Sequence, residues 1–129
     1  MRIYALDRLQ NLKPTAIKFR MPADFDPEAY FADCYGIIHD ENEDTQLIQL
    51  KVNSGQAKYI RALPLHPSQK GIERSKDYAV LSFYIKPTFD FRQEILSMGE
   101  DVEVISPAGF RNEIREVIDT MHKCYCIDE

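Results

Sequence analysis

The chain has 129 residues, of which 44% are hydrophobic and 29% charged, and its net charge is −5 at pH 7. This length fits one domain, or one domain plus a fragment of another, with enough apolar material for a core without disulfides or a metal. The negative charge argues against general coating of nucleic acid, although a local basic patch still binds phosphate. The sequence shows no membrane-length apolar run and no signal-peptide pattern, and its three cysteines are an odd number. We therefore expect a reduced, cytoplasmic protein without membrane contact.

The N-terminal part of the chain predicts a short strand without close neighbours. Residues 2–6 alternate as a strand does, and Asp7 is suited to cap one turn over residues 8–11. No second strand follows closely in the sequence. Either this strand pairs with a distant segment, or the chain begins inside a domain.

A connector with one short helix is expected before residue 45. Asp26 followed by Pro27 is typical of a helix N-terminus, with the aspartate as cap and the proline at the first helical position. The helix is expected to run to about Cys34, and Gly36 suits its C-terminal end. Residues 39–44 then predict an exposed acidic turn.

From Thr45 onwards the pattern becomes regular. The strongest strand is 78–86, where Ala79, Leu81, Phe83 and Ile85 form one face. Before it, we expect a strand ending at Val52, a helix over 55–62 capped by Ser54, and a strand over 68–75. After it, we expect a helix that runs to Met98, with a capping box of Asp90 and Gln93 at its start and Gly99 at its end. A strand over 102–105 and a last helix opened by Pro107 complete the chain.

The order of these elements is β-α-β-β-α-β followed by a helix. This α+β order predicts a ferredoxin-like sandwich, in which four antiparallel strands have helices on one face. A short strand and a short helix precede it. The second face of strand 78–86 is only half apolar, so we expect it to be covered by the last helix, by a partner or by a ligand.

A basic island in this acidic chain is the first functional signal. Residues 51–76 carry six lysines and arginines and one acid, Glu73. Within it, a proline-stiffened loop over 63–70 gathers hydrogen-bond donors suited to an anion. The alternative is a structural linker, in which the histidine bonds a backbone carbonyl and the serine and glutamine cap the strand. The residues predicted to form this anion pocket are Arg61, His66, Ser68, Gln69 and Lys70.

A second candidate set consists of Tyr84, Lys86 and Arg92, because aromatic and cationic groups on an open sheet face stack on bases and hold phosphates. Core packing or a subunit contact is the alternative for Tyr84. We expect no cofactor and no metal. His122, Cys124 and Cys126 at the C-terminus do not fit a metal site, because positions i and i+2 of a helix point apart.

Several stretches resemble a known family. Residues 2–9, Arg-Ile-Tyr-Ala-Leu-Asp-Arg-Leu, resemble the final strand and turn of the WYL domain of bacterial transcriptional regulators. Residues 63–69, Leu-Pro-Leu-His-Pro-Ser-Gln, together with 88–90 and 98–104, resemble the C-terminal extension, called the WCX domain, that follows it. Residues 19–26 are similar to the family's connector. The resemblance divides the chain into a WYL remnant at 1–13, a connector with a short helix at 14–44, and a ferredoxin-like WCX domain at 45–129.

The resemblance implies a piece of a regulator. Family members carry an N-terminal winged helix-turn-helix, a small WYL barrel and this extension, and the last two sense a ligand, in some members single-stranded nucleic acid, and mediate dimer contacts. By this resemblance Arg2 and Arg8 line the ligand groove; the alternative is solvated charges. The helix-turn-helix and most of the barrel have no counterpart here, and the chain has no tryptophan. We therefore expect no duplex DNA binding by this chain alone.

Two hypotheses follow. The first is a non-catalytic regulatory module that binds single-stranded nucleic acid or another anionic effector and forms a homodimer. The second is a purely structural oligomerisation domain that pairs through the sheet face of Tyr78, Val80 and Tyr84. A small hydrolase using Ser68 and His66 is a remote third reading, because no nucleophile elbow or oxyanion loop is visible.

Overall fold

Strands and helices alternate along the chain after residue 45 in the predicted order. The computed structural model describes residues 4–126. Two short 3-10 turns, η1 (Leu6–Arg8) and η2 (Gly99–Asp101), accompany the regular elements. These are α1 (Pro27–Phe31), β1 (Gln46–Asn53), α2 (Ser54–Ala62), β2 (Lys70–Arg74), β3 (Tyr78–Ile85), α3 (Phe89–Ser97), β4 (Val102–Ser106) and α4 (Ala108–Tyr125).

The four strands form one antiparallel sheet in the order β2-β3-β1-β4. β1 lies inside the sheet, where Leu50 is paired with Leu81 of β3 on one side and with Val104 of β4 on the other. β2 and β3 form a hairpin, whereas the connections from β1 to β2 and from β3 to β4 contain α2 and α3. This topology confirms the ferredoxin-like sandwich predicted from the sequence.

Three helices cover a single face of the sheet. Ile60 of α2, Ile95 of α3 and Ile114 of α4 belong to one buried cluster with the strands. Because alternate residues of β1, β3 and β4 enter this cluster, the opposite face of the sheet has no helix on it in residues 4–126. The inward-facing strand residues are Ile48, Leu50, Val52, Ala79, Leu81, Phe83, Ile85 and Val104.

Phe91 joins the helices to the sheet. It is fully buried, and its ring centroid lies 6.1 Å from that of Phe83 on β3 and 6.1 Å from that of Phe110 on α4. Burying a phenylalanine side chain stabilises the fold by about 1.5–3 kcal/mol. The contact between strand, crossover helix and final helix therefore rests on one aromatic cluster.

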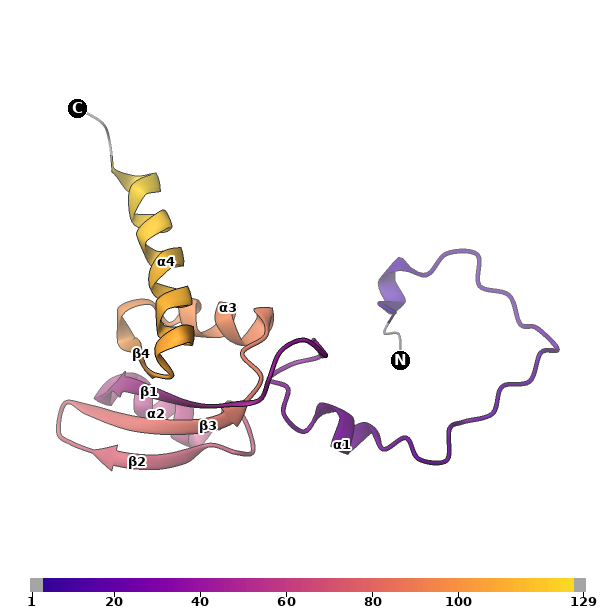
Figure 1. Cartoon of the computed structure of the whole chain (residues 1–129), viewed down its shortest axis with the longest axis horizontal. Coiled ribbons are helices and arrows are strands. Elements are labelled where there is room, and N and C mark those ends of the chain that lie inside the picture. Colours follow the sequence, from indigo (N-terminus) through magenta and orange to yellow (C-terminus); the bar gives the residue numbers. More distant parts are fainter. Residues whose placement is uncertain (1–3, 127–129) are drawn as a thin grey trace.

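The last helix extends beyond the sheet. α4 has 18 residues, which corresponds to a length of about 27 Å. Phe110 and Ile114 in its first half are buried, whereas Ile118 and Met121 in its second half are 51% and 48% exposed. Figure 1 shows the C-terminal half projecting away from the strands. The apolar stripe of α4 is thus packed into the core in its first half and accessible to solvent in its second half.

The cap of α2 lies one residue before the predicted position. Asn53, not Ser54, is the N-cap, and its side-chain oxygen accepts a hydrogen bond from Gln56 N–H at 2.8 Å. Both residue types are good caps, and the register of β1 decides between them, because the strand continues to Asn53.

The predicted capping box at α3 is wrong. The N-cap is Thr88, and Asp90 lies within the first turn. The Asp90 carboxylate accepts hydrogen bonds from the Thr88 hydroxyl and from Ile38 N–H, the latter at 3.4 Å. A tertiary contact with the connector therefore takes the side chain that the sequence assigns to the cap. The stop at Gly99 is confirmed, since this glycine has a φ of +57°.

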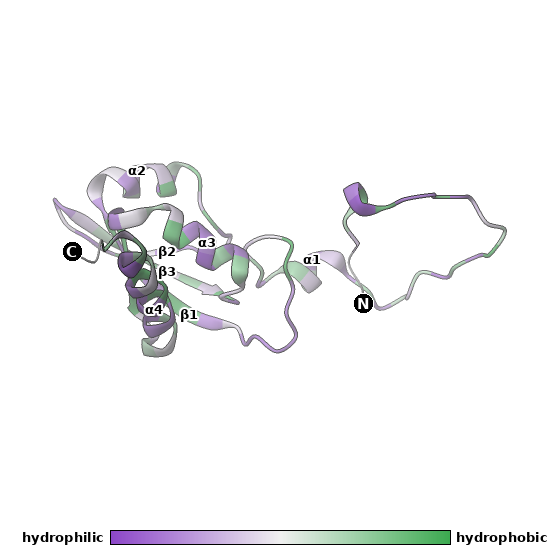
Figure 2. Ribbon diagram, turned by 90° about the horizontal axis from the view of Figure 1, so that it is seen from above, coloured by the Kyte–Doolittle hydropathy of each residue, from purple (hydrophilic) through white to green (hydrophobic). Residues whose placement is uncertain are grey.

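Residues 4–26 form an arm outside the sandwich. Figures 1 and 2 show an extended segment that leaves the folded domain and curves back. Residues 2 and 3 of the predicted strand lie outside the described residues, and the rest of that prediction is wrong, since Tyr4 and Ala5 are in no strand and a turn follows at η1. A strand requires a hydrogen-bonding neighbour, and within residues 4–126 no strand lies alongside this segment.

The connector helix α1 begins as predicted. Asp26 is its cap and accepts a hydrogen bond from Glu28 N–H at 2.9 Å, with Pro27 in the first turn. The helix ends at Phe31, earlier than the sequence indicates. The connector then crosses the end of β3, where Lys86 N–H donates to the Asp33 carbonyl at 2.8 Å.

Candidate functional site

The loop between α2 and β2 is built around a buried histidine. His66 is 5% exposed, and its Nδ1 accepts a hydrogen bond from Ser68 N–H at 3.2 Å and lies 2.7 Å from the Ser68 hydroxyl oxygen. Because Nδ1 is the acceptor, the ring proton is on Nε2, and the ring bonds the backbone of Ala32. His66 therefore joins the loop to the connector.

The environment of His66 favours the neutral imidazole. Burial lowers the pKa of His66 below 6.5, and this effect outweighs the hydrogen bond to Ala32 and the charge of Asp33, which raise the pKa. The ring is therefore uncharged at neutral pH. It adds no positive charge to an anion pocket, in contrast to the role that the sequence allows.

Ser68 and Gln69 also hold the loop in shape. The Ser68 hydroxyl oxygen accepts a hydrogen bond from Tyr84 N–H at 2.9 Å and lies 3.2 Å from the Tyr84 carbonyl oxygen. The Gln69 side chain donates to the Ile60 carbonyl at 3.0 Å and accepts from Leu65 N–H at 3.0 Å. These bonds have the linker role weighed as the alternative above. Ligand binding by the two side chains stays a prediction.

A basic pocket lies between α2 and the β2–β3 hairpin. It has a volume of about 220 Å³, and its lining includes Ser54, Ser75 and Tyr78 besides the charged residues. Arg61 lines this pocket, and its Nε donates to the Ala57 carbonyl at 3.0 Å. The charged residues of the pocket, here called the basic cluster, are Lys58, Arg61, Arg74 and Lys76.

The four cations of the basic cluster are exposed, and none forms an ion pair within residues 4–126. Four uncompensated positive charges around one pocket concentrate a positive potential in a chain whose net charge is −5. Arginine binds phosphate through two parallel hydrogen bonds, and lysine attracts phosphate as a point charge. The geometry is therefore suited to a phosphate-bearing or other polyanionic ligand.

The other two lysines of the basic island lie on the open face of the sheet. Lys51 and Lys70 face the even-numbered residues of β3, and Lys51 Nζ lies 4.7 Å above the Tyr78 ring. The Tyr78 hydroxyl donates to Glu73 at 2.6 Å, which raises the pKa of Tyr78. Tyr84 is 59% exposed on the same face. Since Tyr78 also lines the basic pocket, it connects that pocket with the open face.

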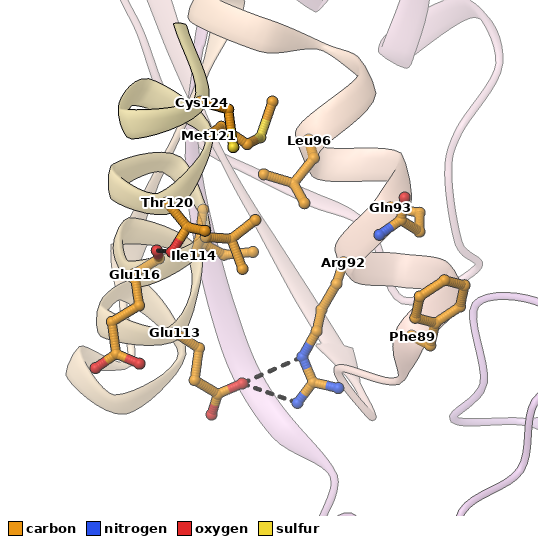
Figure 3. A pocket seen from close by; sticks show the side chains of 11 residues that line it. Phe89, Arg92, Gln93, Leu96, Glu113, Ile114, Glu116, Thr120, Met121 and Cys124 are labelled. Atoms are coloured by element: carbon orange, nitrogen blue, oxygen red, sulfur yellow. Dashed lines mark hydrogen bonds and ion pairs between the residues drawn. The ribbon is translucent and has the colours of Figure 1, made fainter. Parts of the chain in front are cut away.

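Lys86 and Arg92 are engaged by acids rather than free for a ligand. Lys86 Nζ lies 3.9 Å from the Asp33 carboxylate. Arg92 lies 2.8 Å from Glu113 and 3.4 Å from Glu43, and Figure 3 shows its guanidinium turned towards Glu113 between α3 and α4. Ligand binding by Arg92 stays a prediction.

Arg2 lies outside the described residues. Arg8 ends the turn η1, is exposed, and lines a surface pocket with residues 37–39 of the connector. It does not line the basic pocket. The structure therefore does not bring Arg8 together with Arg61, and its ligand role stays an expectation from the resemblance.

A second, apolar groove runs along α4. Its volume is about 580 Å³, and Figure 3 shows Leu96 of α3 opposite Ile114, Thr120 and Met121 of α4. The charged residues in its lining are Arg92, which is paired with Glu113, and Glu116. The groove suits an apolar partner surface more than an anion.

A family model for the WCX domain matches residues 44–121, which is more than half of the chain. The chain belongs to the WCX domain family. The match covers the sheet, α2, α3 and most of α4, but neither the arm nor α1. The WCX domain is a regulatory C-terminal part of WYL-type regulators and is not known as a catalytic domain.

No curated protein matches the chain. None of the helices in residues 4–126 combines the length and apolarity needed to cross a membrane.

The sequence identified Arg61 but missed the residues that surround it in this WCX domain. Lys58, Arg74 and Lys76 contribute to the basic island, yet only the fold shows that α2 and the hairpin bring them to one pocket. The sequence showed that basic residues are dense between residues 51 and 76, but it did not show where each of them lies in the fold. The connector also holds a cluster of metal-ligand types at Asp33 that sequence reasoning read as part of a short helix and an acidic turn.

Proposed function

We propose that this WCX domain is a non-catalytic, effector-sensing module of a bacterial, cytoplasmic transcriptional regulator, and that its ligand is a single-stranded nucleic acid bound at the basic cluster. The observation that carries this proposal is the gathering, around one pocket of an acidic chain, of four cations that have no ion-pair partner in the described part of the chain, residues 4–126. The family assignment supports the regulatory part of the proposal.

The path for a strand follows from the positions of the side chains. Phosphates bind Arg61 and Arg74 in the pocket, and the chain continues past Tyr78 onto the open face of the sheet. There Tyr84 offers an exposed ring for a base, and Lys51 offers a further charge. Stacking on an aromatic ring is tolerant of base identity, so we expect weak sequence preference.

The test is a titration of a short fluorescent single-stranded oligonucleotide, followed by anisotropy. Arg61→Ala and Arg74→Ala are expected to weaken binding at least about tenfold together, because each removes a charge-assisted hydrogen bond. Arg115→Ala is the matched control, since Arg115 is an exposed arginine on α4 outside the basic pocket. Equal loss of affinity in the control and in the pocket variants would contradict this site.

Self-association along α4 is the second candidate function. The exposed part of its apolar stripe, Val117, Ile118 and Met121, adjoins the groove beside α3. This surface is a better candidate than the sheet face named from the sequence, because Val80 of that face is 8% exposed. A homodimer that buries α4 explains why the stripe continues past the core.

A further inference from the structure

The junction between the connector and the sheet holds three metal-ligand types in one small volume. A carboxylate oxygen of Asp33, the thiol of Cys34 and a ring nitrogen of His39 all lie within 4.8 Å of one another. We propose that these three side chains bind a divalent transition metal of the Zn²⁺ class. The site is separate from the basic cluster and does not depend on the proposed nucleic-acid function.

His39 supplies the observation that points to a missing ligand. Its Nδ1 is buried and has no hydrogen-bond partner among residues 4–126. Its ring stacks on Tyr30 with centroids 4.0 Å apart and planes 18° from parallel, which fixes the direction of the nitrogens. A buried polar atom without a partner is unfavourable, and such atoms in native proteins call for a water, an ion or a functional role. A metal ion at this nitrogen supplies the partner.

The other two proposed metal ligands, Cys34 and Asp33, are also held in place by their surroundings. Cys34 is 5% exposed, and its thiol makes a long contact of 3.8 Å with the Asp33 carboxylate. The carboxylate is oriented by the Thr45 hydroxyl, which donates to it at 2.5 Å, and by Lys86 at 3.9 Å. Outer groups that orient a ligand in this way are a regular feature of metal sites.

The donor set selects the class of metal. Thiolate, imidazole and carboxylate together suit a borderline-soft cation such as Zn²⁺ or Co²⁺ rather than Mg²⁺ or Ca²⁺. The thiol releases its proton to solvent when the metal binds, so that thiolate and carboxylate balance the two charges of the ion. Lys86 keeps its hydrogen bond to the Asp40 carbonyl, at 3.2 Å, beside the site. Solvent completes a tetrahedral coordination.

A metal ion at this site would hold the connector against the folded domain. The Asp33 carbonyl already accepts from Lys86 N–H at the end of β3, so Asp33 and Cys34 are anchored to the sheet side. His39 lies across the following turn. An ion that joins the three fixes residues 33–39, and the expected consequence is slower proteolysis of this segment in the presence of Zn²⁺.

The experiment is a titration of the full chain with Co²⁺, followed by optical absorption. A thiolate ligand gives a sulfur-to-cobalt charge-transfer band in the ultraviolet, and tetrahedral Co²⁺ gives visible bands. The C-terminal tail needs a control, because Cys126 Sγ lies 3.5 Å from His122 Nε2 and this pair also attracts metals. We therefore compare Cys34→Ser and His39→Gln with the tail variant Cys126→Ser.

The proposal predicts one Co²⁺ per chain with a charge-transfer band in the wild type and in Cys126→Ser. Cys34→Ser loses the band, and His39→Gln weakens binding at least about tenfold while keeping the far-ultraviolet circular dichroism of the wild type. His39→Gln keeps the test decisive if Cys34→Ser unfolds. Absence of the band in the wild type, its loss in Cys126→Ser, or unchanged affinity in His39→Gln would overturn the proposal.

Discussion

Replacing His66 with alanine tests whether this side chain holds the loop between α2 and β2 in its folded shape. The side chain is 5% exposed, and its removal leaves Ser68 N–H and the Ala32 backbone without their partner. Each partly buried group that loses its hydrogen bond costs about 1–2 kcal/mol, so we expect a loss of about 2–4 kcal/mol in the free energy of unfolding. That is a large part of the about 5–15 kcal/mol typical of a domain.

The assay is urea unfolding followed by far-ultraviolet circular dichroism, because the chain has no tryptophan to serve as a fluorescence probe. His122→Ala is the control, since His122 is exposed on α4 and its loss is expected to cost less than about 0.5 kcal/mol. Equal and small effects of the two variants would refute the reasoning. An oligonucleotide affinity lost in His66→Ala without any loss of stability would make the loop a ligand site instead.

The same residue predicts a pH dependence of stability. The pKa of His66 is lowered by burial in the folded state, whereas the unfolded chain has the ordinary value of 6.5. Between the two values the unfolded chain binds more protons, so the stabilisation is fully present above pH 6.5 and is lost as the pH falls through the folded pKa. The melting temperature is therefore expected to fall on acidification below pH 6.5, and to fall less in His66→Ala.

Two further predictions concern the connector and α4. A Cβ added at Gly36 would overlap the Asp90 carboxylate, so Gly36→Ala should cost about 1–2 kcal/mol by displacing the hydrogen bonds of Asp90, and the cost should shrink in an Asp90→Ala background. Additive costs in this double-mutant cycle would show that the two residues do not meet. Ile118→Glu on the exposed stripe of α4 should lower the mass measured by light scattering from dimer to monomer, whereas Arg115→Glu on the same helix should not. A monomeric wild type would exclude this interface.

The fold was predictable because its signals are local. The strand β3, predicted from its alternating residues, and the Asp26-Pro27 start of α1 depend on neighbouring residues alone, and both are confirmed. The position of Gly99 at the end of α3 is of the same kind. The cap at Asp90 was mispredicted because a connector residue more than fifty positions away, Ile38, uses the same carboxylate.

The candidate site was less predictable because it is assembled by topology. The sequence placed Arg61 and Lys70 in one pocket, since only nine residues separate them. The fold puts Arg61 on the helix side and Lys70 on the open face, and it brings in Arg74 from the hairpin instead. The sequence counted His66 as a free donor, although the residue is buried, its Nδ1 accepts from Ser68 N–H and its ring bonds the Ala32 backbone. The spacing of charges along the sequence shows neither which face of the sheet a residue lies on nor whether it is buried.

The salt dependence of single-strand binding is the most direct test of the proposed function. If the four cations of the basic cluster contact phosphates, the logarithm of the affinity falls with the logarithm of salt with a slope of about −2.8. Raising salt from about 50 to about 200 mM then weakens binding about 50-fold, and only about sevenfold in a variant that lacks the charges of Arg61 and Arg74. A slope near zero, or one unchanged in that variant, would contradict the account.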